Sequence, residues 1–121
     1  MIKIGLVGCG RISGNHFQAI KSFAGRCRLV GTCDIVGERA AKAAAENGCN
    51  SYTSLDKMLS EEKPDLVAIC TPSGLHPQHG ITVAQAGVHV LTEKPIGVKL
   101  DDVDHLIHAC DAAAVQLFVV K

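Results

Sequence analysis

The sequence has 121 residues, of which 47% are hydrophobic, 20% are charged and only 3% are aromatic. This length is typical of one domain, and its core must be built from aliphatic side chains and alanine. Twelve basic residues balance twelve acidic ones, which argues against nucleic-acid and anionic-membrane partners. No apolar run reaches the roughly 20 residues of a membrane span, and no signal peptide precedes the first patterned segment. We therefore expect one cytoplasmic domain.

The six cysteines include no Cys-x-x-Cys pair, and Cys33 and Cys70 lie within apolar segments. Zinc sites need closely spaced ligand pairs, and a thiol nucleophile needs a base that the sequence does not place. We expect reduced core thiols and no metal site. Disulfides, a zinc site or a thiol nucleophile are the alternative interpretations.

Five short apolar runs have the length of strands: Ile2–Val7, Leu29–Cys33, Leu66–Cys70, Val88–Leu91 and Val115–Val120. Their apolar character is nearly continuous rather than alternating. That pattern is typical of strands that helices cover on both faces of the sheet.

Helical spacing separates these runs, in Glu38–Asn47, Pro77–Ala86 and Leu100–Ala114. Gly48 and Gly87 follow the first two segments directly, as glycine commonly does at the end of a helix. The third segment begins with acidic residues, which suit the start of a helix. We expect one face of it to pack on the sheet, formed by Val103, Leu106, Ile107 and Cys110.

Two weaker segments complete the pattern. Asn50–Tyr52 fits a short edge strand, and Leu55–Leu59 fits a helix capped by Ser54. Strand and helix then alternate along the whole chain, which predicts a parallel sheet with right-handed crossovers. The fold class is α/β, a doubly wound, Rossmann-type sheet with helices on both faces. In such sheets ligands bind beyond the carboxyl ends of the strands.

A glycine-rich turn follows the first strand, where residues 8–14 read Gly-Cys-Gly-Arg-Ile-Ser-Gly. Gly8 permits a tight turn and Gly10 leaves room for a pyrophosphate against the backbone. A helix that opens around Ile12 and ends near Phe23 would point its free N–H groups at that anion. Glycine pairs also occur in ordinary turns and in methyltransferases, so the motif gains its weight from its position between strand and helix.

Asp34 ends the second strand, where an acidic residue meets the ribose hydroxyls of an adenine dinucleotide. Its carboxylate would accept hydrogen bonds from NAD and repel the additional phosphate of NADP. NAD is therefore the favoured cofactor. Arg11 and Arg39 leave NADP open, because a guanidinium pairs readily with a phosphate, although both also suit an exposed surface.

The third long strand leads into Thr71, Pro72 and Ser73, and then into His76. A loop with two prolines is stiff and would form a wall of the site at its nicotinamide end. His76 could donate a hydrogen bond to a ribose or a phosphate, or it could cap the helix that follows.

The fourth long strand leads into Glu93, Lys94 and Pro95. A lysine at this edge of the sheet can hydrogen-bond a substrate hydroxyl and assist departure of its proton during hydride transfer. His79, three residues after His76, is a weaker candidate for the hydrogen-bonding role of His76. His105 and His108 could be metal ligands, but an exposed polar helix face explains them better, and His16 and His89 suit structural or peripheral positions.

These motifs, in this order and at these spacings, resemble the amino-terminal domain of the Gfo/Idh/MocA family, which includes glucose-fructose oxidoreductase and inositol dehydrogenase. The resemblance covers essentially the whole chain, and the Glu93-Lys94-Pro95 tripeptide is its most specific part. It implies binding of NAD or NADP and hydride transfer to or from a sugar, inositol or related polyol.

By matching position, the resemblance implies that Lys94 is the active-site lysine, that Ser73 and His76 contact the cofactor, and that Asp34 binds the ribose. It also implies a cis peptide bond before Pro95. The candidate cofactor-binding residues are Gly8, Gly10, Arg11, Ile12, Asp34, Arg39, Thr71, Pro72, Ser73, His76, Glu93, Lys94 and Pro95.

Family members have a second domain that supplies a catalytic histidine and most of the substrate pocket, and we expect that domain to be absent from residues 1–121. The last 29 residues resemble relatives that act on nucleotide-linked amino sugars. We expect the isolated domain to bind NAD with little turnover and to self-associate as a homo-oligomer through apolar surface that the second domain would cover. A non-catalytic NAD(H)-binding module and an S-adenosylmethionine-binding domain are the alternatives.

Overall fold

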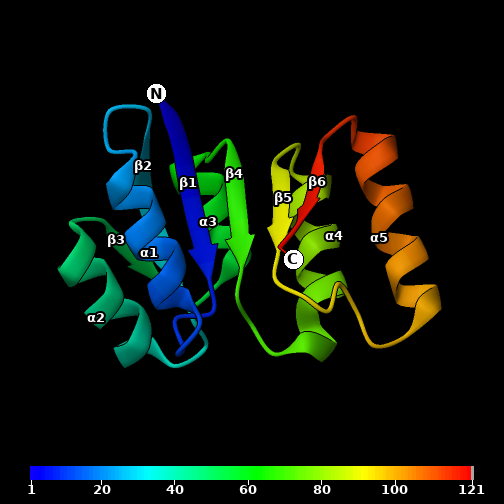
Figure 1. Cartoon of the computed structure of the whole chain (residues 1–121), viewed down its shortest axis with the longest axis horizontal. Helices are drawn as coiled ribbons and strands as arrows, with labels where there is room; N and C mark the ends of the chain where they lie inside the picture. The colour runs from blue at the N-terminus through cyan, green and yellow to red at the C-terminus, as the bar shows by residue number, and fades with distance from the viewer. Residues whose placement is uncertain (121) are drawn as a thin grey trace.

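The strands of this computed structural model, which describes residues 1–120, form one parallel sheet in the order β3-β2-β1-β4-β5-β6 (Figure 1). They are β1 (Ile2–Val7), β2 (Cys27–Cys33), β3 (Asn50–Tyr52), β4 (Leu66–Ile69), β5 (His89–Thr92) and β6 (Leu117–Val119). The helices are α1 (Ser13–Ser22), α2 (Gly37–Asn47), α3 (Leu55–Glu62), α4 (His76–Gln85) and α5 (Leu100–Ala113), with a 3-10 turn η1 at Ser73–Leu75. The predicted Rossmann-type fold is confirmed.

The sheet reverses its direction of growth beside β1. The chain runs from β1 through β2 to β3 at one edge, then returns to place β4 on the other side of β1. The connections that follow β1 and β4 therefore leave in opposite directions. A crevice forms at such a point, at the carboxyl ends of the strands.

Helices cover the two faces of the sheet, and small residues let them approach closely. In Figure 1, α1 and α2 lie in front of β1–β3, and α3 and α4 lie behind the sheet. Gly5 pairs with Gly31 across β1 and β2, and a Cβ atom on Gly5 would lie only 2.9 Å from the Met58 side chain of α3. On the other face, the Thr32 hydroxyl donates to the Ala40 carbonyl of α2 at 2.8 Å.

Most predicted boundaries hold within two residues, but α3 continues to Glu62, three residues beyond the predicted end. Residues 60–62 are all polar, and Glu61 pairs with Lys57 one turn earlier at 3.8 Å, so no apolar spacing marked this turn. The predicted cap is confirmed, because the Ser54 hydroxyl accepts from the Lys57 N–H.

The expectation for α5 holds in part, because Leu106 and Cys110 belong to the same buried core as Val90 of β5. Leu106 and Cys110 are buried, but α5 packs mainly against α4, and Ile107 is 42% exposed. Gly80 of α4 makes this contact possible, because a Cβ atom there would lie 2.6 Å from Leu106 Cδ1.

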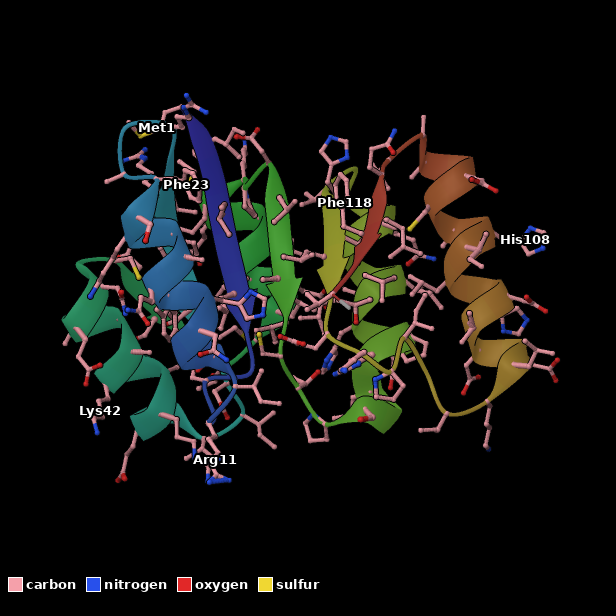
Figure 2. All side chains as sticks on the ribbon, viewed as in Figure 1. Met1, Arg11, Phe23, Lys42, His108 and Phe118 are labelled. Atoms are coloured by element: carbon pink, nitrogen blue, oxygen red, sulfur yellow. The ribbon has the colours of Figure 1, made fainter. Side chains whose placement is uncertain are left out.

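The near face of β4, β5 and β6 carries no helix in the described part of the chain (Figure 1). An apolar groove of about 190 Å³ lies beside α1 on this face, lined in part by Ile20, Leu66 and Leu91. Phe23 and Phe118, labelled in Figure 2, are 57% and 47% exposed. Within residues 1–120, the helices are all too short or too polar to span a membrane.

We expect Gly80→Ala to lower the free energy of unfolding by about 1–3 kcal/mol, because the added methyl group overfills the α4–α5 contact. Alanine is otherwise a better helix former than glycine, by up to about 1 kcal/mol. A loss of stability in Gly80→Ala would therefore reflect the tight contact with Leu106 and not helix propensity. Urea unfolding followed by circular dichroism measures it. Gly25→Ala is the control, because a Cβ atom there meets nothing within 4 Å. Equal stability of the two variants would contradict this packing.

Candidate functional site

A cavity of about 540 Å³ opens at the carboxyl ends of β1, β2, β4 and β5. All the candidate residues from the sequence except Pro95 line it. The structure thus brings together four segments that are far apart in the sequence. Their individual contacts with a cofactor stay predictions.

The glycine turn fits a phosphate-binding role. Gly8 has a φ of +91°, and a Cβ atom there would lie 2.6 Å from the backbone of Cys70 and Thr71. A Cβ atom on Gly10, in contrast, would meet no protein atom within 4 Å, so the space beside it is open for a ligand. No side chain caps the start of α1. Free backbone N–H groups at a helix start are suited to an anion.

Asp34 ties the glycine turn to the end of β2. Its side chain is 8% exposed, and its two carboxylate oxygens accept from the backbone N–H groups of Cys9 and Val36, each at 2.8 Å. Each oxygen keeps a further lone pair for a hydroxyl group. A rigid carboxylate with spare acceptor capacity, at the edge of the cavity, fits recognition of a ribose.

Ile35 and Val36 also line the cavity, and we did not predict them from the sequence. They are 90% and 42% exposed, which is unusual for large aliphatic side chains next to a buried acid. Apolar surface of this kind suits the face of a planar ring such as adenine. Their place directly after the strand that ends in Asp34 was the available signal.

Arg11 and Arg39 line the same part of the cavity and are exposed. In Figure 2, Arg11 lies on the turn after β1 and its guanidinium points away from the ribbon. Neither residue forms an ion pair with the described part of the chain. Both guanidinium groups are therefore free to meet a phosphate.

His76 is 2% exposed, and both of its ring nitrogens face backbone carbonyl oxygens. Nδ1 lies 2.9 Å from the Pro95 oxygen and Nε2 lies 2.5 Å from the Thr71 oxygen. The ring lies between the carbonyl groups of two turns. His76 therefore bridges the turn after β4 to the turn after β5, and no side chain caps α4.

His79 lies beside His76, and its Nδ1 is 2.9 Å from the Thr71 hydroxyl. Burial, and then the neighbouring His76, lower the pKa of His79. A neutral ring follows, which can exchange a hydrogen bond with Thr71 at the wall of the cavity.

Lys94 is exposed and lines the cavity, within a turn that we call the lysine turn, residues 93–95. The peptide bond before Pro95 is cis, as predicted. The Glu93 carboxylate does not point into open solvent but lies 2.6 Å from Nε2 of His16 on α1. His16, which the sequence placed in a structural or peripheral class, thus reaches the edge of the site.

The cysteines near the cavity hold their protons. Burial first, and the Asp34 carboxylate second, raise the pKa of Cys9 to about 12 and that of Cys33 to about 11. Burial and then the charge of Glu93 raise the pKa of Cys70 to about 12. All six cysteines are unpaired. Thiols with such pKa values are poor nucleophiles near neutral pH.

We expect Cys9 and Cys70 of the folded protein to react with iodoacetamide at about pH 8.5 a hundred-fold or more slowly than free cysteine, because only the thiolate reacts. Mass spectrometry of digested protein measures the labelling at each site. The urea-unfolded chain is the control, in which all six thiols should react at ordinary rates. Rapid labelling of Cys9 or Cys70 in the folded protein would contradict the assignment.

Comparison with known proteins agrees with the geometry. Residues 2–121 match the family model described as the oxidoreductase family with an NAD-binding Rossmann fold. The chain is 37% identical to UDP-N-acetylglucosamine 3-dehydrogenase of Acidithiobacillus ferrooxidans over 106 residues, which cover 88% of this chain and 32% of that enzyme. It is 36% identical to D-apiose dehydrogenase of Paraburkholderia graminis, over 94% of this chain and 30% of that protein.

Among solved structures, the WlbA dehydrogenase of Bordetella pertussis, in complex with NADH and UDP-GlcNAcA, superimposes with a TM-score of 0.96 at 47% identity. The match covers 98% of this chain and 36% of that one. The chain thus spans about a third of the length of these relatives. Residues 2–121 belong to the Gfo/Idh/MocA oxidoreductase family, as its NAD-binding Rossmann domain.

Proposed function

We propose that this domain binds NAD in the strand-end cavity and presents Lys94 for hydride transfer to or from an alcohol carbon of a sugar, nucleotide sugar or polyol. One observation carries the proposal. The cavity combines an uncapped helix start, a buried carboxylate and an exposed lysine. Taken along the crevice in the strand order β2, β1 and β5, the carboxylate, the helix start and the lysine would meet the adenosine ribose, the phosphates and the reacting end of a dinucleotide.

The residues of the domain divide the binding between them. The backbone around Gly10 and the start of α1 would hold the pyrophosphate, and Asp34 would accept hydrogen bonds from the adenosine ribose. Ile35 and Val36 would cover one face of the adenine ring. Thr71, Pro72 and Ser73 would then form a wall of the cavity next to the lysine turn.

Lys94 has the clearest chemical role in this proposal. Bound nicotinamide supplies the hydride acceptor or donor. The Lys94 ammonium would donate a hydrogen bond to the oxygen of the reacting carbon, which stabilises negative charge there as the hydroxyl proton leaves. In the reverse direction it would stabilise the same oxygen as the carbonyl is reduced.

The substrate class rests on the relatives. UDP-N-acetylglucosamine 3-dehydrogenase and the WlbA dehydrogenase are both named or crystallised with a UDP-linked amino sugar, so we favour a nucleotide sugar. Because these proteins are about three times as long, we propose that further protein completes the substrate pocket and supplies acid–base groups beyond Lys94.

We propose NAD rather than NADP as the preferred cofactor, because the Asp34 carboxylate would lie next to the additional phosphate. Asp34→Ala should raise the Kd for NAD at least about tenfold, as expected for loss of a hydrogen bond to a charged group. The ratio of NADP to NAD affinity should rise in the same variant, because a repulsive charge is removed. Calorimetric titration of the 121-residue chain measures both.

The ratio is the decisive quantity. Asp34→Ala also removes the contacts of Asp34 with Cys9 and Val36, which loosens the glycine turn. This weakens the binding of both cofactors alike, so it leaves the ratio of their affinities unchanged. Arg39→Ala is the control and should change the Kd for NAD less than about threefold, as expected for an exposed charge. A wild-type domain that binds NADP more tightly than NAD, and loses that affinity in Arg39→Ala, would overturn the preference. Binding of S-adenosylmethionine alone would overturn the function.

We also propose that the domain self-associates through the uncovered face of β4, β5 and β6. A net charge of zero removes long-range repulsion between two copies, and Phe118 exposes apolar surface on this face. A second copy of the same chain is the occupant that we expect.

Sedimentation velocity over a range of concentrations should therefore show dimers or larger species that Phe118→Ser shifts toward monomer. Ile107→Ser is the matched control, because Ile107 is similarly exposed but lies on α5. A monodisperse wild-type monomer at high concentration would refute the proposal.

A further inference from the structure

We propose that His16 is a positioning residue that holds the lysine turn at the nicotinamide end of the cavity. This inference rests on the proposed function, because it assigns the place of Lys94 relative to the bound cofactor. The observation behind it is the 2.6 Å contact between His16 Nε2 and Glu93 Oε1, which joins residues 77 positions apart.

The contact is sheltered from solvent. The His16 and Glu93 side chains are 14% and 13% exposed. A carboxylate only accepts hydrogen bonds, so Nε2 of His16 must carry the proton and donate. Hydrogen bonds to charged groups are stronger than neutral ones, and limited exposure reduces the competition from water. The contact is therefore suited to fixing the direction of the Glu93 side chain.

His16 supplies an anchor that the rest of the lysine turn lacks. Two contacts hold its backbone, since the Glu93 N–H donates to the Ile69 carbonyl at 3.2 Å and the Pro95 carbonyl faces Nδ1 of His76. These bonds hold the turn from β4 and from α4. Among residues 1–120, His16 is the side chain that holds it from the side of α1. The Lys94 ammonium makes no hydrogen bond within the same range, so its position depends on the backbone of the turn.

The same helix serves both ends of the cofactor. α1 begins at Ser13, whose hydroxyl donates to the Gly10 carbonyl at 2.5 Å, and His16 follows one turn later. Residues three apart lie on the same side of a helix. The start of α1 faces the proposed pyrophosphate site, while His16 reaches the neighbour of Lys94. A fixed distance between the phosphate end and the lysine follows from this rigid link.

The experiment compares NAD with ADP-ribose, which carries the adenosine, both phosphates and the second ribose but no nicotinamide. Calorimetry is performed on the 121-residue chain as wild type, His16→Ala and His16→Gln. We expect His16→Ala to weaken NAD binding by roughly fivefold to tenfold, as for loss of one hydrogen bond at the nicotinamide end. The Kd for ADP-ribose should change less than about twofold.

The conservative variant His16→Gln tests whether His16 acts by positioning the lysine turn or only by supporting the fold in general. A glutamine amide can place an N–H donor close to the position of Nε2, so His16→Gln should recover most of the NAD affinity. His108→Ala, on the exposed outer side of α5 (Figure 2), is the matched control and should bind both ligands like wild type. In a Glu93→Ala background, the further change His16→Ala should have no added effect on NAD binding, because the two residues act as a pair.

The outcomes divide clearly. An equal loss of NAD and ADP-ribose affinity in His16→Ala would mean a general role in the fold and would overturn the inference. Unchanged NAD affinity, or an undiminished effect of His16→Ala in the Glu93→Ala background, would overturn it as well. A wild-type chain that binds neither ligand would overturn the proposed function and this inference with it. A wild-type chain that binds both leaves the proposed function standing, whichever result the variants give.

Discussion

The position of β1 between β2 and β4 is the constraint on which the rest of this structure depends. Because all strands are parallel, their carboxyl ends meet at one edge of the sheet. Because the chain crosses from β3 back to β4, the loops after β1 and β4 separate there and leave a crevice. Every residue of the candidate site follows a strand at this edge, so the chemistry of the domain is a consequence of its strand order.

Polar contacts between distant segments then define the shape of the crevice. Asp34 joins the turn after β1 to the end of β2. His76 joins the turn after β4 to the lysine turn, and His16 joins α1 to the same turn. Each contact adds a side-chain link between segments that are far apart in the sequence. A site fixed in this way can receive a dinucleotide with little loss of conformational entropy on binding.

The fold was largely predictable because local signals agreed with one another. Apolar runs located the strands, and glycines such as Gly48 marked where helices end, at a φ of +65°. The clustering of the motifs at the strand ends was also predictable. In a parallel sheet the strand order alone brings these ends together, whatever surface each helix packs against. The packing of α5 on α4 was not predictable, because an amphipathic pattern shows which face of a helix is buried but not which element buries it.

The pairing of side chains within the site was also beyond the sequence. His16 and Glu93 lie 77 residues apart, and nothing in either local segment indicates the other. His76 is a similar case, because its position suggested a free donor while its burial between two carbonyl groups depends on the turn that ends at Pro95. Such pairings depend on loop conformation, which spacing along the chain does not encode.

The most direct test of the central claim is to map the backbone amide shifts of the isotope-labelled chain while NAD is added. We expect shift changes concentrated in residues 8–12, around Asp34, at Thr71 and Ser73, and in residues 93–94. Changes concentrated instead at the amino ends of the strands, for example around Pro64 and Gly87, would place the ligand away from the strand-end cavity and contradict the proposed binding site.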